Sequence, residues 1–88
     1  MNNARRKDLR KLIAQLEKID FELREISSAL GDLITEEEEA YDNLPEGIQA
    51  SERGEQMQEI IDQLYNAQSD LDDIKLEEVY NQIEEAIG

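Results

Sequence analysis

Carboxylates are the side chains of this chain whose type and spacing allow chemistry. The stretch ITEEEEAYDNLPEG sets four consecutive glutamates and an aspartate just before the only proline. Neighbouring carboxylates bind divalent cations, exchange protons in acid–base catalysis, or attract a basic partner through their summed negative charge. The rest of the composition decides which of these roles the sequence supports.

The composition argues against catalysis and metal binding. The 88 residues include no His and no Cys, so imidazole bases, thiol nucleophiles and the histidine-containing di-iron pattern are all missing. The segment DLDDIKLEEVYN begins like a calcium loop, but it lacks the glycine at its sixth place and ends in Asn81, where such loops need Glu. We therefore expect that the chain is not an enzyme and uses no cofactor and no metal.

The negative charge gathers in the middle of the chain. Between positions 32 and 62 there are eleven acidic residues against Arg53 alone. These candidate partner-binding residues are Asp32, Glu36, Glu37, Glu38, Glu39, Asp42, Glu46, Glu52, Glu55, Glu59 and Asp62. A concentrated negative surface favours binding to a basic protein. The alternative is a solvated face that only keeps the protein in solution.

The positive charge lies at the start of the chain. Residues 1–18 carry a net charge of +4, whereas residues 19–88 carry −18, which together give the −14 of the chain. If the chain reverses near Gly47, position i lies opposite about 94 − i, and Arg10 faces Glu84. We interpret the basic segment as an electrostatic clamp that fixes the register of two helices. The alternative is a segment that binds nucleic acid or anionic lipid.

Apolar residues in a heptad pattern indicate the helix that positions the first acidic stretch. Their spacing alternates between three and four, which is typical of an a/d coiled-coil seam. The seam consists of Leu9, Leu12, Leu16, Ile19, Leu23, Ile26, Leu30 and Leu33, and runs on through Glu37, Ala40 and Leu44. Ile13, Ile34 and Tyr41 widen the stripe, so we expect more than one partner helix and dimerisation into a helical bundle.

The turn between the helices is expected at DNLPEGIQAS. Pro45 disfavours helical geometry at Leu44, Gly47 permits a tight turn, and Ser51 is a candidate N-cap of the next helix. We expect a single helical domain over residues 1–88. Its first arm covers about 4–43, the turn 44–50, and the second arm about 51–87.

Two glycines interrupt the helical pattern. Gly54 lies close to the start of the second arm, where it costs roughly 1 kcal/mol relative to alanine. Gly31 lies in a patch of small residues. It is either a tolerated defect of the helix or the site of a close helix contact or kink.

The second arm changes phase towards its end. Its apolar residues are Met57, Ile60, Ile61, Leu64, Ala67, Leu71 and Ile74, and then Leu76, Tyr80, Ile83 and Ile87 on a different face. We favour one continuous helix. The alternative is a break near Asp72 and Asp73, with Ser69 or Asp73 capping a short third helix. The predicted fold is all-α, an antiparallel two-helix coiled-coil hairpin with or without this third helix.

The segment AYDNLPEGIQASERGE, residues 40–55, resembles a recurring turn in small acidic helical-hairpin proteins of Gram-positive bacteria and their phages. The similarity covers Ala40 to Glu46 and Ser51 to Glu55, with looser helical character on both sides. The resemblance implies a mobile-element origin. Because these relatives are uncharacterised, it transfers no catalytic or binding residue.

Three functions fit these observations. The first is a non-catalytic phage-type inhibitor that mimics nucleic acid on a basic DNA- or RNA-handling defence enzyme, as anti-CRISPR and anti-restriction proteins do. The alternative is a structural coiled-coil module that forms a homodimer or bridges proteins. A third is a regulator that binds a basic protein without mimicry. We expect a protein of the bacterial cytoplasm that does not bind a membrane directly, because no apolar run approaches ~20 residues. We also expect no direct binding of nucleic acid, because the basic segment has no interleaved aromatic residues and the acidic remainder of the chain repels phosphates.

Overall fold

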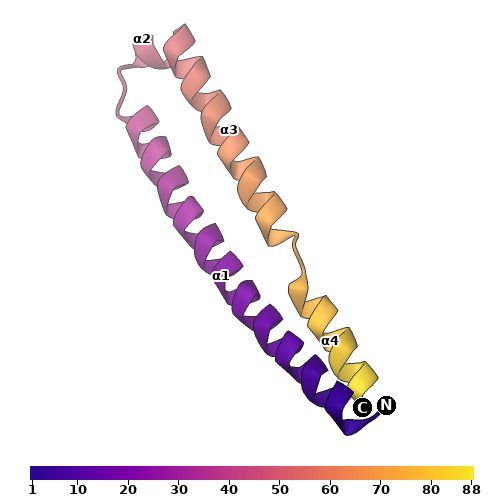
Figure 1. The fold of residues 1–88 in the computed structure, drawn as a ribbon. Helices are drawn as coiled ribbons and strands as arrows, with labels where there is room; N and C mark the ends of the chain where they lie inside the picture. Colours follow the sequence, from indigo (N-terminus) through magenta and orange to yellow (C-terminus); the bar gives the residue numbers. More distant parts are fainter. The chain divides into compact units, whose positions relative to one another are not determined.

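The computed structural model describes residues 1–88 and contains helices only. They are α1 (Asn3–Asp42), α2 (Glu46–Gln49), α3 (Glu52–Asp72) and α4 (Leu76–Ile87) (Figure 1). The chain forms two compact units: unit 1 comprises Met1–Glu25 with Ile74–Gly88, and unit 2 comprises Ile26–Asp73. In each unit a stretch of α1 pairs with a returning helix, which confirms the predicted all-α hairpin. The single domain over residues 1–88 stays a prediction.

Unit 2 pairs the second half of α1 with α3. Ile34 of α1 and Ile61 of α3 are buried between them. The Ser27 hydroxyl donates to Asp72 at 2.6 Å, and the Tyr65 hydroxyl donates to Glu38 at 2.6 Å. A later residue of α1 therefore meets an earlier residue of α3, so the two helices are antiparallel.

The turn of unit 2 contains the short helix α2, and one side chain joins it to α1. Gln49 Nε2 donates to the carbonyl oxygens of Tyr41 at 3.0 Å and Asp42 at 3.4 Å. These bonds satisfy carbonyls that the end of α1 leaves without intrahelical partners. Ser51 occupies the predicted N-cap position of α3, but it makes no side-chain cap, because its hydroxyl donates to the Ile48 carbonyl instead.

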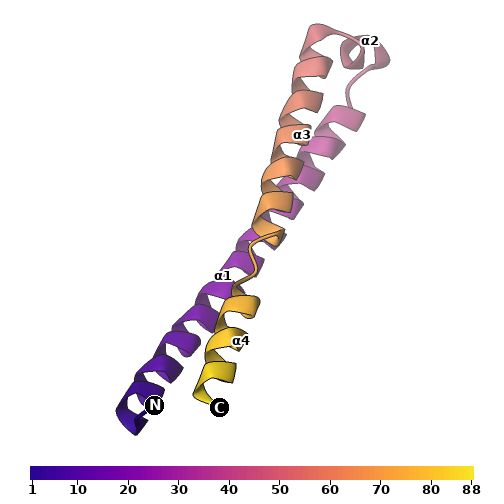
Figure 2. The same cartoon turned by 90° about the vertical axis from the view of Figure 1, so that its right-hand side faces the viewer.

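Unit 1 pairs the first half of α1 with α4, and both chain termini belong to it (Figure 2). Ile13 of α1 and Ile87 of α4 are its buried residues. Leu9 and Leu16 lie half-buried on the same side of α1 as Ile13. Each unit thus has a core of one buried isoleucine from each helix, with half-buried residues around it.

The prediction of a continuous second arm is wrong, because α3 ends at Asp72 and α4 begins at Leu76. The inward side chains of α3 include Leu64, Gln68 and Leu71, so a continuous helix would next turn Lys75 and Glu78 inward. The break lets α4 turn different residues inward, namely Leu76, Tyr80, Ile83 and Ile87. Neither Ser69 nor Asp73 caps α4, since its N-cap position is Lys75 and carries no side-chain bond.

The predicted register is also shifted. The expected numbers of opposed residues add up to 94, whereas those of Ser27 and Asp72 add up to 99 and those of Glu38 and Tyr65 to 103. In unit 1, Arg24 and Glu77 add up to 101. The cause is α2, because an extra helical turn after Pro45 moves the point of reversal several residues beyond Gly47.

The predicted a/d seam of α1 does not face the returning helices as a whole. The inward side chains are those at a and e, such as Leu9, Ile13, Leu30 and Ile34. The d residues are about half-exposed: Leu12 at 49%, Ile19 at 47%, Ile26 at 53% and Leu33 at 54%.

None of the helices combines the length and the apolar character that crossing a membrane requires.

Candidate partner-binding site

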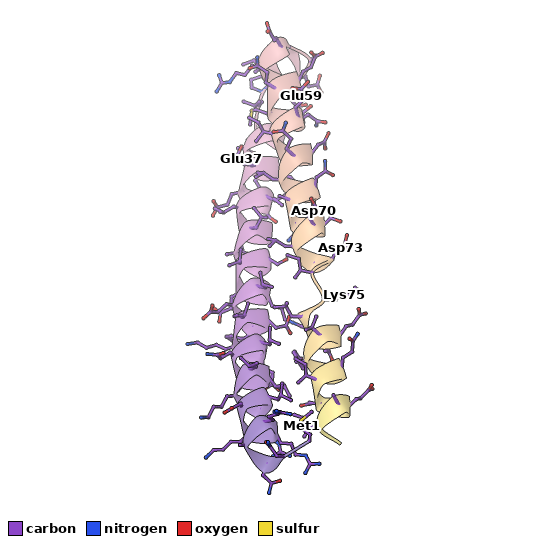
Figure 3. All side chains as sticks on the ribbon, turned by 45° about the vertical axis from the view of Figure 1, so that its right-hand side comes forward. Met1, Glu37, Glu59, Asp70, Asp73 and Lys75 are labelled. Atoms are coloured by element: carbon purple, nitrogen blue, oxygen red, sulfur yellow. The ribbon has the colours of Figure 1, made fainter.

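All eleven predicted partner-binding residues belong to unit 2. The turn at α2 sets the last turns of α1 beside the first turns of α3, so both acidic stretches lie at this end of unit 2 (Figure 1). Figure 3 labels one residue from each stretch, Glu37 on α1 and Glu59 on α3. Ten of the eleven side chains are exposed, and Glu38 is half-buried. We call these eleven residues the acidic end.

The acidic end is electrically uncompensated. Unit 2 contains fourteen acidic residues and one basic residue, a net charge of −13, whereas unit 1 contains nine acidic and eight basic residues, a net charge of −1. Both ion pairs of the structure lie in unit 1. They join Arg24 to Asp20 at 3.4 Å and to Glu77 at 3.7 Å. No residue of the acidic end takes part in an ion pair.

A hollow between α1 and α3 lies within the acidic end. It is lined by Glu38, Tyr41, Asp42, Gln58, Ile61, Asp62 and Tyr65. The Tyr65 hydroxyl donates to Glu38 Oε1, and this bond, together with burial and the charge of Glu38, raises the pKa of Tyr65 above its usual 10.0. Three carboxylates and two aromatic rings without a cation fit the ammonium or guanidinium group of a Lys or Arg side chain.

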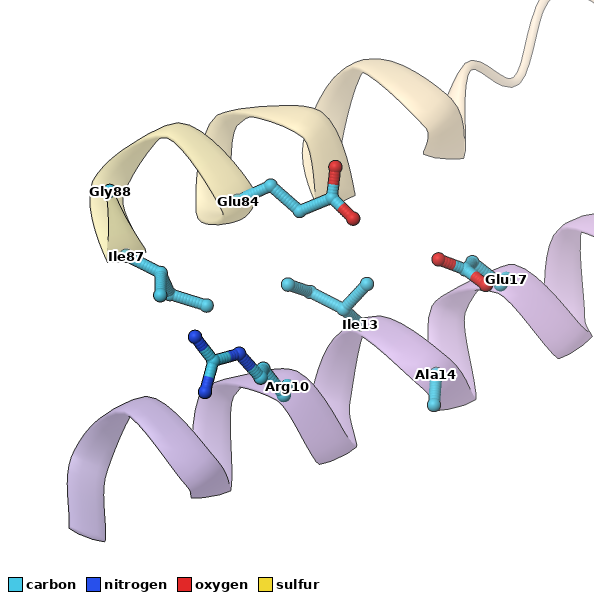
Figure 4. Close-up of a pocket in the computed structure, with 7 residues that line it drawn as sticks. All are labelled: Arg10, Ile13, Ala14, Glu17, Glu84, Ile87 and Gly88. Atoms are coloured by element: carbon cyan, nitrogen blue, oxygen red, sulfur yellow. The ribbon is translucent and has the colours of Figure 1, made fainter. Parts of the chain in front are cut away.

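The predicted electrostatic clamp in unit 1 does not form. Arg10 and Glu84 line one hollow with Ile13 and Ile87, but no ion pair joins them (Figure 4). Figure 4 shows the Arg10 guanidinium beside Ile87, while the Glu84 carboxylate points away from it. None of the six basic residues of positions 1–18 forms an ion pair, and the interhelix ion pair of unit 1 joins Arg24 to Glu77.

Arg24 lies in the acidic surroundings of Tyr80. Burial raises the pKa of Tyr80 above 10.0, and the carboxylates of Glu77, Asp20 and Glu17 raise it further, while Arg24 lowers it. Tyr80 is thus an inward residue of α4 whose hydroxyl stays protonated to higher pH than that of a free tyrosine.

Several polar contacts within unit 2 were not predicted from the sequence. Gln68 Nε2 donates to the Ser27 carbonyl at 3.0 Å, and an added Cβ on Gly31 would lie 2.8 Å from the same nitrogen. Gly31 therefore lies against the Gln68 side chain of α3. The signal for Gln68 was its inward heptad position, which it shares with Ile61, and Gln49 gave no comparable signal.

No group of three or more acidic side chains is placed to hold a metal ion. The sequence matches no protein-family model, and neither a curated protein nor a solved structure is similar to it.

Proposed function

We propose that this chain is a non-catalytic protein that acts by binding a basic partner protein with its acidic end. The observation that carries the proposal is the absence of any ion pair among the eleven carboxylates of the acidic end. Like charges this close repel one another and destabilise the free protein. A positively charged partner surface relieves that repulsion, so binding and stability are coupled.

The partner class that fits is an enzyme that handles nucleic acid. Such enzymes hold a phosphate backbone in a groove lined with Lys and Arg, and a protein surface with many carboxylates competes for the same groups. The resemblance of residues 40–55 to phage-associated proteins favours a defence enzyme of a bacterial host, as in anti-CRISPR or anti-restriction inhibition in the cytoplasm.

The hollow of the acidic end gives this binding an anchor. A Lys or Arg side chain of the partner enters between Tyr41 and Tyr65 and meets the carboxylates of Asp42 and Asp62. Glu38 accepts a hydrogen bond from the Tyr65 hydroxyl, and this bond holds the Tyr65 ring in place. A charged side chain that is bound and partly desolvated in this way contributes more than an exposed ion pair.

A pull-down from host lysate at low and high salt tests the proposal. We expect the parent chain to capture a basic, nucleic-acid-binding enzyme at low salt and to lose it above ~0.15 M, where the screening length is ~8 Å. The triple variant Glu36→Lys, Glu37→Lys and Glu39→Lys is expected to lose the capture while keeping the Tyr65–Glu38 bond.

The matched control makes the same charge change in unit 1. Glu78, Glu84 and Glu85 are exposed and form no ion pair, so their reversal to Lys alters the net charge equally. This control variant is expected to capture the enzyme as the parent chain does. Equal capture by both triple variants means that the acidic end only keeps the protein in solution.

The second candidate function is a structural coiled-coil module, and a separate observation favours it. The d residues of α1 remain about half-exposed within units that bury only four hydrophobic side chains. Apolar residues repeated every seven positions are typical of a surface that packs against further helices. Such a module links protein chains and needs no basic target.

A further inference from the structure

Each unit exposes apolar side chains at matching helix positions. In unit 2 these include Ile26 and Leu33 of α1 and Ile60 of α3, which are 53%, 54% and 48% exposed. In unit 1 they include Leu12 and Ile19 of α1, and Val79 of α4 is 45% exposed. Along α1 these residues recur every seven positions, so they follow one stripe of the helix.

In unit 2 the exposed apolar residues of both helices share one face. Leu33 and Ile60 each precede a buried isoleucine by one position, whereas Glu38 and Tyr65 each follow one by four. Positions i − 1 and i + 4 lie on opposite sides of position i on a helix. Because Glu38 and Tyr65 bond to each other on one side of the antiparallel pair, Leu33 and Ile60 lie together on the other side.

The charges of α1 show which kind of surface can cover this face. Residues 5–11 carry a net charge of +4, and residues 34–40 carry −4. Neither segment forms an ion pair within the chain. The two segments belong to different units and are charge-complementary, so an antiparallel second copy of the same helix matches both at once.

We propose that two copies of the chain pack through the exposed stripes of α1, antiparallel to each other, about a two-fold axis between Ile19 and Ile26. Position i of one copy then lies opposite position 45 − i of the other, so Leu12 meets Leu33 and Ile19 meets Ile26. Residues 5–11 lie beside residues 34–40 of the second copy, and this pairing occurs twice by symmetry. A parallel arrangement sets like charges side by side.

The inference deepens the second candidate function and does not depend on the binding of a basic enzyme. In the proposed dimer, the basic residues 5–11 of the second copy lie beside Glu36, Glu37 and Glu39. A second copy and a basic partner protein therefore compete for these three carboxylates. The carboxylates of Glu52, Glu55 and Glu59 on α3 lie outside the paired segments of α1. Variants of the apolar stripe therefore test the dimer without changing the charge of the acidic end's own residues.

Sedimentation equilibrium of the full chain is the first test. We expect a dimer for the parent chain, and a monomer with retained helical circular dichroism for the double variant Ile19→Glu and Ile26→Glu. Phe21→Glu is the control, because Phe21 is 64% exposed and off the stripe, and it is expected to stay a dimer. A monomeric parent chain, or a dimeric double variant, overturns the proposal.

Single cysteines test the orientation without destabilising changes, because the chain has no cysteine of its own. Gln15 and Glu22 are exposed and share one heptad position. In the proposed dimer, position 22 lies opposite position 23 of the second copy, whereas position 15 lies opposite position 30. We expect Glu22→Cys to form a cross-linked dimer under mild oxidation and Gln15→Cys to stay uncross-linked. Cross-linking of both variants indicates a parallel pair, and cross-linking of neither excludes the interface; each result overturns the proposal.

Discussion

Replacing Gly54 by alanine is expected to destabilise the protein, although alanine is the better helix former. Gly54 is buried in the first turn of α3. An added Cβ would overlap the carbonyl oxygen of Gln49, and it would lie 2.6 Å from the Gln49 carbonyl carbon and 2.7 Å from its Cα. These are backbone atoms of α2, so no flexible side chain can move aside. The missing side chain lets α2 pack directly on α3.

The size of the effect follows from two opposing terms. Helix propensity favours alanine over glycine by ~1 kcal/mol. Forcing extra atoms into a packed contact costs about 1–3 kcal/mol or more, because the backbone must shift. Because the overlap is with backbone atoms, the cost lies in the upper half of this range. We expect a net loss of about 1–2 kcal/mol, which lowers the melting temperature by roughly 4–16 °C for a domain of this size.

The matched control is Gly47→Ala in α2. A Cβ on Gly47 meets no atom within 4 Å, so only the propensity term acts and the variant is expected to be up to ~1 kcal/mol more stable. Thermal unfolding followed by circular dichroism measures both variants at equal protein concentration. If Gly54→Ala raises the melting temperature as Gly47→Ala does, the close packing of α2 on α3 is wrong.

Two further predictions concern the core and the tyrosines. Ile34→Ala removes a side chain that is 1% exposed and is expected to lower the free energy of unfolding by about 2–5 kcal/mol. Phe21→Ala, at a position that is 64% exposed, is expected to lower it far less. Equal losses of the two variants in chemical denaturation contradict the assigned core. Tyr65 and Tyr80 are expected to ionise above 10.0 in an absorbance titration, and Tyr65→Phe removes one of these late transitions. Because a raised pKa means that the folded state holds its proton more tightly, this stabilisation is complete below pH 10.0 and is lost as the pH rises above it. Ionisation of Tyr65 at the ordinary value argues against the Tyr65–Glu38 bond.

The sequence predicted the parts of the fold that local chemistry dictates. Pro45 cannot continue α1, and the heptad pattern on both sides of it requires two helices that pack together. The same pattern also indicates the break before α4, because a continuous helix would turn Lys75 and Glu78 inward. No proline or glycine lies at the break, so local propensity favours one continuous helix. Burial of Leu76 and Tyr80 decided the outcome over local propensity.

Register and pairing depend on the turn, which local patterns describe poorly. The four residues of α2 moved the reversal point, and Arg24 pairs with Glu77 of α4 in the shifted register. The place of the acidic end followed from residue counts alone. Its lack of ion pairs did not, because that property depends on which basic side chains the register brings near. The half-exposed stripe of α1 likewise appears only once the inward positions are known.

The most direct test of the central claim is competition between this protein and nucleic acid for one basic enzyme. The enzyme captured in the pull-down is mixed with labelled duplex DNA, and displacement of the DNA is followed by fluorescence anisotropy as the protein is added. We expect displacement by the parent chain and by the variant that reverses Glu78, Glu84 and Glu85 to Lys. We expect none by the variant that reverses Glu36, Glu37 and Glu39. Displacement of equal strength by both triple variants contradicts the claim that the acidic end is the binding surface.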